Sequence, residues 1–167
     1  MRHLLLAMLL TLAIVSVGPA LNDDGVSASG PVRRTKVITL ERTVCFGTCP
    51  HYKLTIFSDG LVSYEGIRYV KKAGKANGHI SRAKLNELVK EFTSIDYFSL
   101  ADSYTPGDKT CPQDWTDMPS ANTSLTWRGR TKAVNHYHGC RGSIVLDQLA
   151  KLENKIDEAV NVTRWTK

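Results

Sequence analysis

Four cysteines carry the most distinctive chemistry in this 167-residue chain. Cys45 and Cys49 stand four residues apart in the sequence CFGTCP, and their thiols can meet across a tight turn because Gly47 tolerates a positive φ. Such a pair could act in thiol redox chemistry, could bind a soft metal ion, or could form a structural disulfide. We favour the structural disulfide, because an even cysteine count is typical of exported, disulfide-stabilised chains.

A second candidate site is the sequence HYHGC, which ends at Cys140. On a strand, His136, His138 and Cys140 point to one face, and two imidazoles with a thiolate are a credible Zn or Cu site. The alternative is a half-buried strand end whose cysteine is bridged to Cys111. We favour this alternative and predict no metal and no other cofactor, because a disulfide sulfur is no longer a thiolate ligand.

Four cysteines allow three disulfide pairings, and cysteine count alone does not choose among them. We predict Cys45–Cys49, which are close in sequence around a glycine. The same pairing joins Cys111, in a long polar segment, to Cys140, at the end of a strand. It would tie that segment to the sheet.

Carboxylates that could perform acid–base chemistry are present but form no specific pair. Asp102, Asp114 and Asp117 fall in the long polar segment over residues 101–120, and loop aspartates more often shape turns. The chain has no Gly-rich phosphate loop, nucleophile elbow or His-Glu-x-x-His sequence. We rank a hydrolase last, leave enzymatic activity open, and favour a protein that is not an enzyme.

Residues 1–20 have the pattern of a secretory signal peptide. A short basic start precedes an apolar run over residues 4–17, and small residues occupy positions −3 and −1 of a cleavage site after Ala20. We predict a linker over residues 21–35 and one exported domain over residues 36–167, periplasmic or secreted. No later stretch is long and apolar enough to span a bilayer, so we expect no transmembrane segment in the mature chain.

The composition is that of a globular protein, with 42% hydrophobic and 23% charged residues, which excludes disorder for most of the chain. Lys and Arg total 22 against 16 Asp and Glu, a formal net charge of +6. The basic residues are scattered, without a continuous run that alternates with aromatic residues. The sequence therefore argues against a nucleic-acid partner.

Apolar residues alternate with a period of two in five segments. Strands are predicted over residues 37–41, 52–57, 62–64, 123–127 and 131–138, and residues 67–70 either extend the third strand or form a further one. Asp59-Gly60, between the second and third segments, is a strong hairpin signal, and Arg128-Gly129 is a tight turn between the last two.

Two segments have the helical period instead. The first helix carries Leu85, Leu88, Val89 and Phe92, and the second carries Val145, Leu149, Leu152, Ile156 and Val160. Ser81 is the expected N-cap of the first helix. The order strands, helix, strands, helix predicts an α+β fold, with an antiparallel sheet of about five to six strands and two helices packed on one face.

Several segments resemble the bacterial domain of unknown function number 6438, and the block Cys45–Pro50 is the specific one. The supporting segments are Ile38–Arg42, Tyr52, Asp59-Gly60, Tyr64, Thr116–Pro119, Gly129–Lys132, His136–Gly139, Leu152-Glu153 and Ile156-Asp157. The resemblance covers residues 36–166. It implies export in bacteria and no established activity.

We therefore predict a disulfide-stabilised binding or interaction module of the bacterial cell envelope, whose partner is a protein or another envelope ligand. The candidate binding surface combines Asp117, in the polar segment, with His136 and His138. The alternative is a thiol-redox or Cu/Zn-binding protein that uses the pair Cys45/Cys49 or the two histidines.

Overall fold

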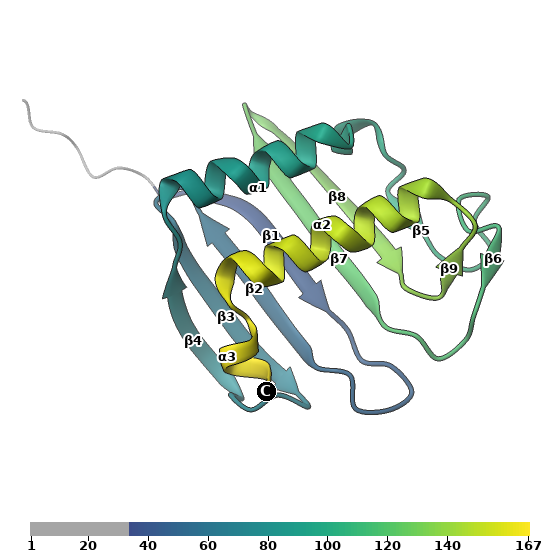
Figure 1. Ribbon diagram of the computed structural model, residues 1–167, viewed down its shortest axis with the longest axis horizontal. Coiled ribbons are helices and arrows are strands. Elements are labelled where there is room, and N and C mark those ends of the chain that lie inside the picture. Colours follow the sequence, from purple (N-terminus) through teal and green to yellow (C-terminus); the bar gives the residue numbers. More distant parts are fainter. Residues whose placement is uncertain (1–33) are drawn as a thin grey trace, which may run out of the picture. The chain divides into compact units, whose positions relative to one another are not determined.

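The computed structural model describes residues 34–167. The predicted signal peptide and the linker up to residue 33 lie outside the described residues. The elements, in chain order, are β1 (Lys36–Arg42), β2 (His51–Phe57), β3 (Leu61–Arg68), β4 (Gly74–His79), α1 (Arg82–Ser94), a 3-10 turn (Tyr97–Ser99), β5 (Ser103–Tyr104), β6 (Gln113–Asp114), β7 (Ser120–Trp127), β8 (Arg130–Tyr137), β9 (Cys140–Arg141), α2 (Ile144–Val160) and α3 (Thr163–Thr166) (Figure 1).

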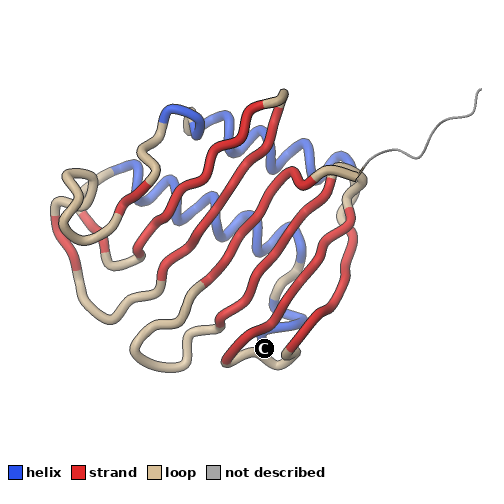
Figure 2. Tube along the Cα trace, turned by 180° about the vertical axis from the view of Figure 1, so that it is seen from behind, coloured by secondary structure: helices blue, strands red, loops and turns tan. Residues whose placement is uncertain are grey.

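Seven strands form one sheet in the order β4-β3-β2-β1-β7-β8-β5. All neighbours are antiparallel except β5, which runs parallel to β8, and β6 pairs with β9 in a separate two-stranded ribbon. Figures 1 and 2 show both long helices on the same face of the sheet, with the opposite face uncovered by helices. The chain therefore folds into two layers, and the site described below lies between them.

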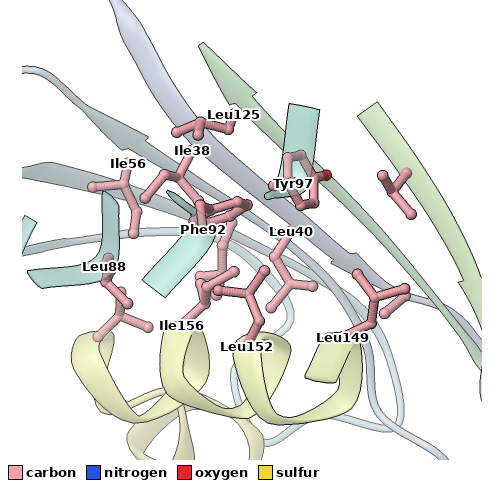
Figure 3. Close-up of a cluster of buried hydrophobic side chains, with 14 of the residues drawn as sticks. Ile38, Leu40, Ile56, Leu88, Phe92, Tyr97, Leu125, Leu149, Leu152 and Ile156 are labelled. Carbon is pink, nitrogen blue, oxygen red and sulfur yellow. The ribbon is translucent and has the colours of Figure 1, made fainter. Parts of the chain in front are cut away.

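The core forms where the alternating strands meet the helical stripes. Ile38 and Leu40 of β1 point toward the helices and are almost fully buried, as is Leu125 of the neighbouring β7. Figure 3 shows these side chains packed against Phe92 of α1 and Ile156 of α2. The period of two along the strands and the period of 3.6 along the helices thus bury one shared apolar layer.

Local signals fix both helix starts. The Ser81 hydroxyl accepts a hydrogen bond from the Lys84 N–H at 3.1 Å, so Ser81 is the N-cap of α1 as predicted. Ser143 caps α2 in the same way through the Val145 N–H. Gly60 closes the β2–β3 hairpin at φ +85°, and a Cβ there would lie 2.2 Å from the Ile80 carbonyl oxygen. None of the helices within residues 34–167 is long and apolar enough to cross a membrane.

The predicted α+β class and element order are confirmed, but the predicted count of about five to six strands is too low. The sequence did not predict β4, because this strand lies at the sheet edge and its sequence GKANGH has no apolar alternation. The strands β5, β6 and β9 have two residues each, too short for any period to register. The main sheet is also mixed, because β5 joins it in parallel.

Candidate functional site

A cluster of polar side chains lies between the sheet and α2, close to where β1 ends. We call it the polar cluster, and it consists of Arg42, Tyr52, His136, His138, Glu153 and Asp157. Arg42 is the last residue of β1 and faces Tyr52 across the ladder. His136 belongs to β8, while Glu153 and Asp157 stand one turn apart on α2. Four separate elements thus contribute to one cluster.

Glu153 is the centre of the polar cluster, and its side chain is 0% exposed. The Glu153 Oε1 atom accepts a hydrogen bond from His136 Nδ1 at 2.8 Å. The Oε2 atom accepts from His138 Nε2 at 2.6 Å and from Arg42 Nη1 at 3.2 Å. Charge-assisted hydrogen bonds of this kind are what makes a buried carboxylate tolerable.

Asp157 holds the other side of the Arg42 guanidinium. Its Oδ2 atom accepts from Arg42 Nη2 at 3.0 Å and from Arg42 Nε at 3.2 Å. The Tyr52 hydroxyl donates to Oδ1 at 2.8 Å. Arg42 also donates to the side-chain oxygen of Asn154 at 3.0 Å. The guanidinium is therefore fixed by three residues of a single helix, α2.

The short contact between His138 and Glu153 determines where the proton lies. An imidazole nitrogen at 2.6 Å from a carboxylate oxygen must carry the hydrogen, since two acceptors at that distance would repel. The Nε2 atom is therefore a donor, and Arg42 Nη1, which lies 3.1 Å from it, donates to Glu153 rather than to the ring. The two imidazole rings lie with their centroids 4.7 Å apart and their planes tilted by 30°.

The two carboxylates have opposite pKa shifts. Burial pushes the pKa of Glu153 upward, but hydrogen bonds from His136 and His138 outweigh burial, and the pKa lies below its ordinary value. Burial also raises the pKa of Asp157, and there Arg42 and Tyr52 do not offset it fully. Burial and the neighbouring Asp157 raise the pKa of the Tyr52 hydroxyl. Glu153 is thus the preferred anion of the cluster.

The donor set His136, His138 and Glu153 could in principle hold a metal ion, since its ligand atoms lie within 4.8 Å of one another. A cation already occupies this position, however. The Arg42 guanidinium lies within about 3 Å of both Glu153 Oε2 and His138 Nε2, where it would repel a divalent ion. Cys140, which would have completed the His136/His138 metal site, is bonded to Cys111. These residues therefore fit an ion-pair network better than a zinc or copper centre.

Two disulfides are present, and their pairing is the predicted one. Cys45 is bonded to Cys49 within the loop between β1 and β2. Cys111 is bonded to Cys140, which joins the segment after β5 to the start of β9 across a separation of 29 residues. None of the cysteines within residues 34–167 is free.

The two disulfide-bearing loops lie against each other at one end of the sheet. We call this surface the stapled end, and it consists of residues 43–50, residues 111–119 and His138. The Phe46 N–H donates to the Asp117 carbonyl at 3.1 Å, and the Thr43 hydroxyl accepts from the Ser120 N–H at 2.8 Å. Hydrogen bonds and disulfides together hold both loops in one arrangement.

Aromatic side chains project from the stapled end into solvent. Phe46, between the two bonded cysteines, is 89% exposed, and Trp115 in the other loop is 63% exposed. The Arg141 guanidinium lies 4.8 Å from the centroid of the Trp115 ring. Exposed aromatics on covalently closed loops are the most unusual feature of this surface, because such residues are normally buried.

The three residues of the predicted binding surface fall into different environments. Asp117 is exposed in the stapled end. The His138 side chain is 21% exposed, and its backbone N–H donates to Pro119 at 2.9 Å, so it borders the same surface. His136 is 2% exposed, behind the outer layer, and cannot touch a surface ligand. The surface we carry forward therefore contains Asp117 and His138.

Sequence reasoning missed Arg42, Glu153 and Asp157 as parts of a site. One signal was present: Glu153 stands four residues after Leu149 and three before Ile156, within the apolar stripe of α2. A charged residue in such a stripe requires a buried partner. Phe46 carried no signal of its exposure, because a lone aromatic between two cysteines is equally compatible with the core.

The chain was compared with known families and with curated proteins. The family described as "Domain of unknown function (DUF6438)" matches residues 36–160, which is most of the chain. No curated protein matches it.

Proposed function

Because this chain belongs to the family described as a domain of unknown function, DUF6438, we propose a function from its own surface: it is an exported interaction module that binds a protein of the cell envelope through the stapled end. The observation that carries the proposal is Phe46, which is 89% exposed on a loop closed by the Cys45–Cys49 disulfide. An exposed phenyl ring has an unfavourable contact with water that a partner's pocket would remove.

The rigidity of the stapled end supports binding rather than accidental exposure. Ordering a flexible loop on association opposes binding by roughly 0.5–1.5 kcal/mol for each immobilised side chain. The disulfide and the hydrogen bond from Phe46 N–H to Asp117 have already removed much of the loop's freedom. Aromatic anchors in such pre-formed surfaces dominate the energetics of many interfaces.

The same surface indicates the chemistry of the partner. Phe46 requires an apolar pocket, while Trp115, partly covered by Arg141, favours a flat apolar contact beside it. Asp117 is exposed and would accept hydrogen bonds from a basic group at the rim. We therefore expect a folded protein surface with an apolar pocket bordered by Lys or Arg.

Export is supported by the two disulfides, which persist in oxidising compartments, and by the signal-peptide pattern of residues 1–20. Protein recovered from outside the cytoplasm should begin at Leu21. Recovery of a mature chain that retains Met1 would contradict the export proposal, and fractionation would then find the protein in the cytoplasm.

Photo-crosslinking tests the binding role directly. p-Benzoylphenylalanine is introduced at Phe46, and in a matched variant at Glu87, which is 60% exposed on α1 away from both loops. Irradiation of living cells should yield a discrete adduct from position 46 and none of the same mass from position 87. Adducts from both positions, or from neither, would contradict docking through this surface.

Affinity measurements with the purified partner from the crosslinked adduct then distinguish the contribution of the Phe46 ring from that of the disulfide that orders its loop. Phe46→Ala should weaken the affinity at least about tenfold, because a buried aromatic hot spot contributes roughly 2 kcal/mol. Cys45→Ser with Cys49→Ser should also weaken it, although Phe46 is retained, because the loop loses its order. Unchanged affinity in both variants would refute the proposal.

A thiol-redox role is the second candidate, and one observation favours it: the Cys45–Cys49 disulfide lies in a loop whose intervening residues are all exposed. A redox-active pair would have a reduction potential well above about −300 mV, whereas structural disulfides of exported proteins fall below it. We expect the lower value. Equilibration with glutathione buffers followed by thiol alkylation measures the potential.

A further inference from the structure

A cleft opens at the other end of the sheet, between α1 and the hairpin that joins β7 to β8. The volume of this cleft is ≈ 670 Å³. Ser120 and Trp127 are the two ends of β7, so at 3.3 Å per residue the cleft is about 23 Å from the stapled end. Ligand sites for small molecules commonly have volumes of roughly 300–1,000 Å³.

The walls of the cleft are apolar and already ordered. Val89 of α1 is buried, and Phe98 and Trp127 are half-buried, packed against the core on one side. Both aromatic residues line the cleft, and the Arg130 guanidinium covers part of the Phe98 ring. A flat apolar group between α1 and the hairpin would therefore contact aromatic surface without any rearrangement of the core.

The rim of the cleft has one sign of charge. Lys90, Arg128 and Arg130 line it, and no acidic residue does. Within residues 34–167 none of these three cations forms an ion pair, although the Arg130 guanidinium lies 4.4 Å from the Phe98 ring centroid.

Three of the nearby acids form ion pairs with lysines that do not line the cleft. On α1, Glu87 is paired with Lys84 at 2.6 Å and Glu91 with Lys155 at 2.6 Å. Asp102 is paired with Lys132. Glu87 also interacts electrostatically with Lys90, but no acidic residue lines the cleft itself, so the rim keeps a positive potential that favours an anionic occupant.

The hairpin turn fixes the backbone of one of the three cationic residues. Arg128 and Gly129 form the two-residue turn between β7 and β8, with φ +50° and +74°. Such turns usually carry Asn-Gly, because both positions require the left-handed region. The Cα of Arg128 is thereby anchored at the mouth of the cleft, between the paired residues Trp127 and Arg130.

We propose that this cleft binds a small organic anion that has a flat aromatic body, with the ring against Phe98 and Trp127 and the anionic group between Arg128 and Arg130. Charge complementarity and size carry the proposal. The site is separate from the stapled end and independent of the function proposed for it.

Two probes that differ by one charged group test the proposal. 1-Anilinonaphthalene-8-sulfonate carries the aromatic body and a sulfonate, and N-phenyl-1-naphthylamine carries the same body without the charge. Fluorescence titration of the purified protein should show one saturable site that binds the sulfonate about tenfold more tightly. That preference should fall with added NaCl, because exposed charges are screened.

Variants locate the site. Arg128→Gln with Arg130→Gln should weaken sulfonate binding about tenfold and change binding of the neutral probe less than twofold. Trp127→Ala should weaken both probes. The matched control is Lys71→Gln with Lys75→Gln, which removes the same charge from exposed positions outside the cleft and should change neither affinity.

Near-UV circular dichroism of each variant establishes that its fold is retained, since the sulfonate probe also binds loosely packed states. Three results would overturn the proposal: no saturable sulfonate binding below about 1 mM, equal affinity for the two probes, or equal loss in the lysine control. A Trp127→Ala variant that is folded and binds both probes normally would also overturn it.

Discussion

Replacing Glu153 by leucine removes the carboxylate that the His136 and His138 imidazoles share. In the folded protein this carboxylate accepts hydrogen bonds from His136, His138 and Arg42 at 2.8, 2.6 and 3.2 Å. Leucine has a similar size but no acceptor. The variant leaves one buried donor and one partly buried donor without this acceptor, and it leaves Asp157 as the carboxylate that still pairs with Arg42.

The expected loss in the free energy of unfolding follows from these donors that have lost their acceptor. Each buried donor without an acceptor costs about 1–3 kcal/mol, and breaking a buried ion pair costs roughly 3–5 kcal/mol. The terms overlap, so we expect Glu153→Leu to lower the free energy of unfolding by about 4 kcal/mol. That is a large share of the roughly 5–15 kcal/mol that stabilises a typical domain.

Urea denaturation at 25 °C and pH 7 measures this loss. The matched control is Glu158→Leu, the same chemical change at an exposed position five residues along α2, which should stay within about 0.5 kcal/mol of the parent. A second variant, His136→Leu combined with Glu153→Leu, removes one orphaned donor and should recover part of the stability.

The pH dependence supplies an independent check. The folded-state pKa of Glu153 lies below its ordinary value of about 4.3, so its contribution is fully present above about pH 4.3 and is lost as the pH falls through the folded-state pKa. The difference between parent and Glu153→Leu should therefore shrink as the pH falls below about 4.3. A loss below about 1 kcal/mol at pH 7, or one equal to that of Glu158→Leu, would refute the assignment of Glu153 as the centre of the cluster.

Three further predictions concern the same end of the molecule. Asp157→Asn should lower the free energy of unfolding by about 1 kcal/mol at pH 7, which is less than the loss in Glu153→Leu. The reason is that the pKa of Asp157 is raised, so the folded state favours the protonated carboxyl. The contribution of this group to stability is therefore present at low pH and lost as the pH rises through the folded-state pKa. Urea denaturation tests it, and a loss as large as that of Glu153→Leu would contradict it. Cys111→Ser with Cys140→Ser should destabilise by about 3.5 kcal/mol and Cys45→Ser with Cys49→Ser by about 2 kcal/mol, since the first disulfide closes the longer loop; equal losses would show that loop entropy does not set the ranking. Dialysis against zinc followed by elemental mass spectrometry should find no stoichiometric metal, because Arg42 occupies the cation position, and zinc that is retained by the parent but lost in His138→Ala would overturn this.

Much of the fold could be predicted because its signals are local. The alternation of Ile38 and Leu40 predicts β1, and the spacing of Leu85, Leu88 and Phe92 predicts α1, because burial of one face imposes those periods. The capping role of Ser81 depends on residues three positions apart. The edge strand β4 was not predicted because it has no such local signal: it pairs with β3 through its backbone and not through an apolar pattern.

The polar cluster and the stapled end were decided by tertiary structure. Arg42 is 96 residues from His138 and 111 residues from Glu153, and no periodicity relates such positions. They meet because β1 lies between β2 and β7, with β8 beyond it, and because α2 returns across that face. Residue types and local spacing thus determined the strands, the helices and the disulfide candidates. Strand order and the packing of α2 across the sheet determined which charges share one buried volume, because desolvation and ion pairing depend on distance in space and not along the chain.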